Sequence, residues 1–82
     1  MQWPLVKIRW IDSCEPYAGW VRLDSLAPPA SLECVSVGFI IEDGDRAKTI
    51  VPHVTFPVTE NAQGCGIMMI PSASILSIER LG

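Results

Sequence analysis

Hydrophobic and polar residues alternate along much of this chain with a period of two, which is the pattern of half-buried β-strands. The first such stretch places Val6, Ile8 and Trp10 on one face and Lys7 and Arg9 on the other. No stretch shows helical periodicity over the roughly 10–12 residues that an amphipathic helix needs. The pattern therefore predicts an all-β protein with at most a short helical or 3₁₀ turn.

The stretch from Leu32 to Glu42 carries the strongest strand signal in the chain. Its two faces are Cys34, Ser36, Gly38 and Ile40 on one side, and Val35, Val37, Phe39 and Ile41 on the other. Gly38 in the middle predicts a bend or bulge, where the strand passes from one sheet layer to the next. Residues 42–45 are predicted to form a hairpin turn, with Gly44 at a position that tolerates positive φ.

Weaker signals complete the expected order of elements. Residues 19–23 predict a second short extended piece, and residues 24–26 a helical turn. Residues 48–56 predict the partner strand of the hairpin, and Pro52 places that strand at an edge or breaks it. A loop is expected over residues 57–66 and a strand over residues 67–70. A 3₁₀ turn over residues 71–74 and a last strand over residues 75–81 follow. The whole chain, residues 1–82, is expected to form one domain, a small and partly open five-stranded barrel.

Two segments resemble known small β-barrels. Residues 70–79 resemble the strand–3₁₀–strand ending of SH3-like and Sm-like barrels, and residues 37–43 resemble the bent glycine strand and hairpin of the Sm fold. The chain departs from the RNA-binding Sm proteins because it has no clear N-terminal helix and no Arg-Gly pair in its later strands. The resemblance therefore implies the fold and weakens the expectation of RNA binding.

The chain also resembles a group of small proteins of unassigned activity that are encoded by bacteriophages and prophages. The matching pieces are Val6–Ser13, Ser36–Asp45 and Ile70–Leu81, which are spread over most of the chain. This resemblance implies a phage accessory protein that is made inside a bacterium.

Composition and charge limit the classes of partner. Of the 82 residues, 49% are hydrophobic, which is more than one tiny core can bury and favours a homo-oligomer or an apolar binding surface. The net charge of −3, with only six Lys and Arg residues and no basic run, argues against nucleic acid as a partner. No segment approaches the roughly 18 apolar residues of a membrane span, and the start lacks a signal-peptide pattern. We therefore expect a cytoplasmic protein without membrane contact.

Cysteine and histidine offer little for a reaction or a metal. Cys14, Cys34 and Cys65 are odd in number and widely spaced, so we expect small buried side chains rather than disulfides. A zinc site that includes His53 is the alternative, but the paired spacing of zinc ligands is missing. No nucleophile elbow, phosphate-binding loop or dinucleotide motif occurs. The sequence therefore predicts no enzyme, no metal and no cofactor.

The aromatic residues and the scattered cations point instead to binding. Three tryptophans occur, and we expect Trp3 and Trp20 near or outside the core, where they either contact a ligand or pack a subunit interface. An indole beside a guanidinium suits a nucleobase next to a phosphate, and both groups are frequent in binding hot spots. The candidate ligand-binding residues are Arg9, Trp20, Arg22, Lys48 and His53.

Together these features favour a non-enzymatic binding module from a phage that acts as a homo-oligomer. It is expected to bind a host protein or to sequester a small nucleotide signal made by a bacterial defence system. An Sm-like RNA-binding ring and a structural or assembly protein of the virion are the alternatives. Net charge opposes the ring, because neutralising phosphates supplies much of the affinity for nucleic acid.

Overall fold

The computed structural model describes residues 3–13, 19–26, 31–55 and 60–82, which form seven strands and two 3₁₀ helices. The strands are β1 (Leu5–Asp12), β2 (Leu32–Asp43), β3 (Ala47–Val51), β4 (His53–Val54), β5 (Gly64–Cys65), β6 (Met68–Pro71) and β7 (Ile75–Arg80). The 3₁₀ helices are η1 (Leu23–Ser25) and η2 (Ser72–Ser74). No α-helix occurs among the described residues, which confirms the predicted all-β class. Likewise, no described helix is long and apolar enough to cross a membrane.

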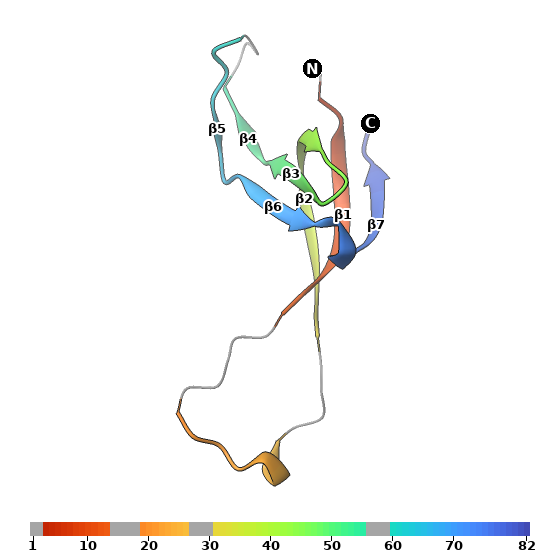
Figure 1. Cartoon of the computed structure of the whole chain (residues 1–82). Helices are drawn as coiled ribbons and strands as arrows, with labels where there is room; N and C mark the ends of the chain where they lie inside the picture. Colours follow the sequence, from red (N-terminus) through yellow and green to blue (C-terminus); the bar gives the residue numbers. More distant parts are fainter. Residues whose placement is uncertain (1–2, 14–18, 27–30, 56–59) are drawn as a thin grey trace.

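Five strands form one antiparallel sheet in the order β6-β3-β2-β1-β7, and β4 and β5 form a separate pair (Figure 1). The central strand β2 pairs with β1 over residues 32–39 and with β3 only from Phe39 to Asp43. The edge strands β6 and β7 are joined by η2 and do not pair with each other in the described part of the chain. The five antiparallel strands are confirmed, whereas the partly open barrel stays a prediction.

The hydrophobic core lies on one face of the five-stranded sheet. It is made by Val6, Ile8, Ile40, Ile50 and Ile70, with Trp10 and Ile75 packed against it. In β1 these residues are two apart, because successive side chains of a strand point to opposite faces. The core is small, since only six hydrophobic residues of the described part are buried. A monomer therefore leaves much of its apolar surface in water.

Val51 is buried on the opposite face of the sheet. It pairs with Phe39 and follows the core residue Ile50, so its side chain points away from the core, yet it is only 2% exposed. The β4–β5 pair packs over it, because a Cβ added to Gly64 would lie 2.8 Å from Cγ2 of Val51. An apolar cavity of about 230 Å³ lies here, lined by Trp3, Ile41, Val51, Val54, Ala62, Gln63, Gly64 and Ile67.

The bend predicted in β2 involves two different residues. The register between β2 and β3 shifts between Ile40 and Glu42, so the bulge falls at Ile41 and not at Gly38. Gly38 has another purpose, since a Cβ added there would lie 3.0 Å from the carbonyl oxygen of Val51. The missing side chain thus lets β3 approach where β2 changes from one neighbour to the other.

The hairpin turn between β2 and β3 is confirmed, but its glycine has a different role from the predicted one. The amide of Gly44 donates to the carbonyl oxygen of Ala47 at 3.1 Å. Among the described residues, positive φ occurs only at Gly19, Gly66 and Gly82, so the prediction for Gly44 is wrong. Space is the reason for glycine here, because an added Cβ would lie 2.9 Å from that same oxygen.

The weaker strand assignments have mixed outcomes. Residues 19–23 pair with no strand in the described part of the chain, so a second strand is not found there, although the backbone at Arg22 is extended and Leu23 begins η1. Pro52 separates β3 from β4, which confirms the predicted break. Residues 64–65, expected in a loop, form β5 opposite residues 53–54. A strand of two residues is too short to show any periodicity, which is why the pattern missed it.

The molecule is elongated, with principal extents of 55 × 24 × 20 Å. Its radius of gyration is 16.7 Å, against about 12 Å for a compact domain of this length. The far half of the β1–β2 ladder extends beyond the other strands toward η1, and η1 lies further out still (Figure 1). The chain therefore presents a compact β-sheet at one end and a protruding pair of strands at the other.

Candidate functional site

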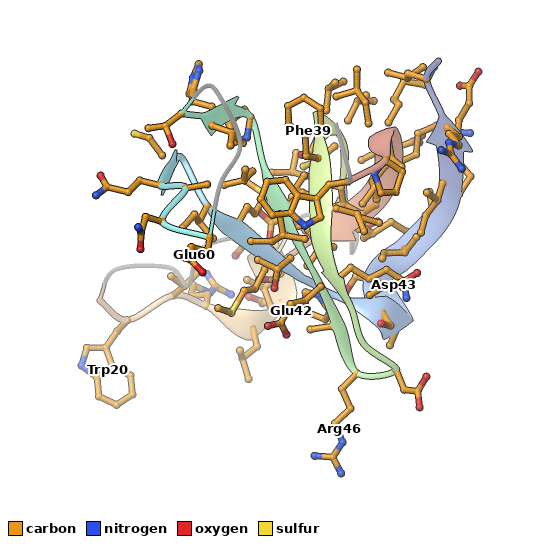
Figure 2. The ribbon with its side chains drawn as sticks, turned by 90° about the horizontal axis from the view of Figure 1, so that it is seen from above. Trp20, Phe39, Glu42, Asp43, Arg46 and Glu60 are labelled. Atoms are coloured by element: carbon orange, nitrogen blue, oxygen red, sulfur yellow. The ribbon has the colours of Figure 1, made fainter. Side chains whose placement is uncertain are left out.

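Residues 19–26, which we call the tip, lie at the end of the molecule far from β4 and β5 (Figure 1). The indole of Trp20 is completely exposed, at 105% of its reference area, and Figure 2 shows it pointing away from the rest of the chain. Leu23 in η1 is 83% exposed, and Val21 and Leu26 are exposed as well. The tip thus presents four large apolar side chains to solvent without support from the core.

The cation of the tip is neutralised within the tip itself. The guanidinium of Arg22 donates to both carboxylate oxygens of Asp24, at 3.1 Å from Nε and 2.6 Å from Nη2. Two such parallel bonds fix the planar group and match its charge. Ser25 also donates its hydroxyl to Asp24 at 3.3 Å. Trp20 therefore stands beside an ion pair rather than beside a free cation.

The two other cations of the candidate set are paired in the same way. Arg9 on β1 donates from Nε to Glu33 on β2 at 2.9 Å, and its Nη2 contacts the same oxygen. Lys48 on β3 pairs with Asp43 and donates to the carbonyl oxygen of Gly44 at 3.1 Å. Both pairs join neighbouring strands and stabilise the sheet modestly. They also remove much of the positive charge that an anionic ligand would need.

His53 lies exposed on β4, directly opposite Cys65 on β5. Both residues line a shallow cavity of about 270 Å³ together with Val54, Thr55, Gln63 and Gly64. No hydrogen bond joins the imidazole to the thiol in the described structure, and no third side chain orients the pair. The arrangement has the residue types of a nucleophile and a base but lacks the geometry that activates one.

Cys65 is the residue of this cavity that the sequence pattern misjudged. It is exposed, so the expectation of small buried cysteines is wrong there, whereas Cys34 is half-buried on β2. Cys14 lies outside the described residues. Among the residues that are described, no group of three or more His, Cys, Asp or Glu side chains could hold a metal ion. Cys65 lies near His53 because β4 pairs with β5, and the spacing of the two residues in the sequence does not reveal this pairing.

The five candidate residues do not form one site. Arg9, Lys48 and His53 belong to β1, β3 and β4, and Trp20 and Arg22 belong to the tip. No hydrogen bond or ion pair in the described structure joins any two of them. Each of the three candidate cations has its own carboxylate partner instead.

Comparisons with protein-family models, with curated proteins and with solved structures found no match for this chain. The proposed function therefore rests on the surface features of the chain itself.

A second apolar surface lies on the far half of the β1–β2 ladder, on the face opposite the core. Val35 and Val37 are 59% and 47% exposed, and Ile11 of β1 is exposed on the same face. Phe39 and Ile41 continue the row toward the β2–β3 hairpin and are half-buried. The row and the tip thus each expose large apolar side chains among the residues that the structure describes.

Proposed function

We propose that this chain is a non-enzymatic protein-binding module that acts as a homo-oligomer and contacts its partner through the tip. The observation that supports this most directly is the fully exposed indole of Trp20, with the exposed Leu23 three residues further along the tip. A tryptophan can bury roughly 200 Å² on binding, which at about 25 cal/mol per Å² is about 5 kcal/mol before ordering costs. Anchors of this type carry most of the binding free energy of many interfaces.

The charges of the chain favour a protein partner over a nucleotide or an RNA. Phosphate recognition needs cations that are free to bond with phosphate oxygens. Arg9, Arg22 and Lys48 already bond with carboxylates of this chain. Arg46 and Arg80 are the described cations without an ion pair, and they lie apart in sequence on the β2–β3 turn and at the end of β7. Nucleotide sequestration and an RNA-binding ring therefore have less support than protein binding.

The resemblance to phage and prophage proteins supplies the expected context, an accessory protein whose partner is a protein of the bacterial host. The strand order supports the proposed small barrel, because the last strand β7 returns to pair with the first strand β1. The 3₁₀ helix η2 separates β6 from β7, as the resemblance to Sm-like and SH3-like barrels implies.

A photo-crosslinking amino acid at position 20 tests the proposal in the producing bacterium. We expect one host polypeptide to be crosslinked from position 20 and not from the control position 45, where Asp45 is an exposed residue of the β2–β3 turn. The identified polypeptide is then purified and its Kd measured by calorimetry. Trp20→Ala should weaken this binding at least tenfold, whereas Asp45→Ala should leave it unchanged.

Two results would overturn this proposal. One is equal crosslinking from both positions, which would mean that the tip has no dedicated partner. The other is a purified oligomer that carries a bound nucleotide in native mass spectrometry and retains it in the Trp20→Ala variant. That second result would favour sequestration of a small signal molecule.

A further inference from the structure

The open edge of β2 is the feature of this fold that most requires a partner. β2 is twelve residues long, but β3 covers it only from Phe39 onward. Pro52 ends β3 and carries no N–H to extend the ladder along β2. The edge of β2 that faces away from β1 is therefore open over residues 32–38 in the described structure.

The alternating direction of the main-chain hydrogen bonds along β2 shows which N–H and C=O groups this edge presents. The amide of Ile40 donates to the carbonyl oxygen of Pro4 at 3.0 Å, on the β1 side. In an antiparallel pair, alternate residues direct both main-chain groups to the same neighbour. Glu33, Val35 and Val37 therefore direct their N–H and C=O groups away from β1. None of the three has a backbone partner on that side among the described residues.

Natural proteins protect sheet edges with proline, charge or short length, and this edge has little of that protection. The two outer strands of the sheet are protected, because β6 is four residues long and ends in Pro71, and β7 ends in Glu79 and Arg80. On the β2 edge the only charge is Glu33, which Arg9 of β1 neutralises. The outward residues are otherwise β-branched and apolar, a composition that favours pairing with another strand.

We propose that the β2 edge pairs with the same edge of a second copy of this chain, antiparallel about a two-fold axis at Val35. In this register Val35 faces Val35 of the second copy, and Glu33 faces Val37. All three outward residues of each copy then find partners, and each Glu33 faces a valine rather than another carboxylate. The two sheets become one continuous sheet, and the exposed rows of valines meet on one face. This interface is the subunit contact of the homo-oligomer, so the proposal rests on the homo-oligomer in the proposed function.

A second copy fits this edge better than an unrelated peptide. With the axis at Val35, the short row of Glu33, Val35 and Val37 is self-complementary in the antiparallel direction, because every outward residue then meets an outward residue of the second copy and the two carboxylates stay apart. An isologous contact of this kind closes after two subunits, which prevents the open-ended pairing that an unprotected edge invites. The tip of each copy lies beyond the paired segment and stays available to another protein.

Disulfide trapping tests the proposed register. The Val35→Cys and Val37→Cys variants are made in a background in which all three native cysteines are serine. Residues that face each other in a hydrogen-bonded antiparallel pair have Cα atoms about 5.5 Å apart, within the range of a disulfide. We expect Val35→Cys to form a covalent dimer at least tenfold faster than Val37→Cys, which lies on the same face but away from the axis. Equal rates, or faster trapping at position 37, would overturn the register.

Light scattering of variants at the β2 edge tests the edge contact separately from the proposal that the chain forms a homo-oligomer. Val35→Pro removes an outward N–H without touching a bond to β1, and Val35→Lys adds a charge on the axis while keeping the N–H. We expect either variant, if its circular dichroism matches the wild type, to raise the dimer Kd at least tenfold. A wild-type oligomer that both folded variants preserve would refute the edge contact alone. A wild type that is monomeric at roughly 100 µM would refute the homo-oligomer and the edge contact together.

Discussion

Replacing Gly38 with alanine should destabilise the protein, because the new methyl group meets main-chain atoms that cannot rotate away. A Cβ at this position would lie 3.0, 3.1 and 3.2 Å from the carbonyl oxygen, carbonyl carbon and nitrogen of Val51. Relief requires β2 and β3 to separate by a few tenths of an ångström at the point where Phe39 and Val51 pair. Ile50, next to Val51, is part of the core, so this movement also loosens core packing.

The expected loss follows from two opposing effects. Overpacking of this kind costs typically about 1–3 kcal/mol. Alanine also restricts the unfolded chain, which returns about 0.4–1 kcal/mol. The midpoints of the two ranges leave a net loss of about 1.3 kcal/mol, and each kcal/mol lowers Tm by roughly 4–8 °C in a domain of this size.

Thermal and urea unfolding of Gly38→Ala at one fixed protein concentration measures this loss. Fixed concentration matters because an oligomer gains stability as its concentration rises. Ser77→Ala is the matched control, since Ser77 is exposed on β7 and should change Tm by less than about 2 °C. A Gly38→Ala protein that is as stable as the wild type would refute the close approach of β3 to β2.

Three further predictions concern the core, a half-buried polar contact and a thiol. Ile70→Ala should cost about 2–5 kcal/mol in urea unfolding, because Ile70 is completely buried and its loss leaves a cavity. Ser36→Ala should cost about 1 kcal/mol in the same assay, since Ser36 accepts a hydrogen bond from Trp10 Nε1 at 3.0 Å; an unchanged stability would contradict that bond. In the folded protein, iodoacetamide should label Cys65 at least tenfold faster than the half-buried Cys34, by peptide mass spectrometry, and equal rates would contradict the exposure of β5.

The strands that the sequence predicts well are those with long alternation. The period-two pattern of β1 is clear because Val6 and Ile8 enter the core on one face. In β2 the pattern comes from the opposite face, where Val35 and Val37 alternate with residues of the core side and are exposed. The hairpin after β2 follows from its turn residues, and the 3₁₀ helix η2 from Pro71 and its small polar neighbours. These features are local, so a single sequence contains the information that determines them.

The features that could not be predicted depend on which strands become neighbours. Arg9 and Glu33 are 24 residues apart, and only the register of β1 against β2 brings them together. The same dependence hides the contact between Gly38 and Val51 and the position of Cys65 opposite His53. Trp20 is the opposite case, because its exposure does not depend on which strands pair or in which register. The expectation that it lies near or outside the core is confirmed.

Pairing also explains why the candidate cations failed to gather into one site. A strand residue in an antiparallel sheet can reach residues opposite and diagonal to it on the adjoining strands. In this chain Lys48 lies opposite Asp43, and Arg9 reaches the diagonal Glu33. Cations that stabilise the sheet are therefore not free to recognise an anion, even though their number and types suit one. The apolar residues of the tip and of the β2 edge have no such internal partners in the described structure. For this reason the proposal of protein binding rests on the exposed apolar surface of the chain rather than on its charged residues.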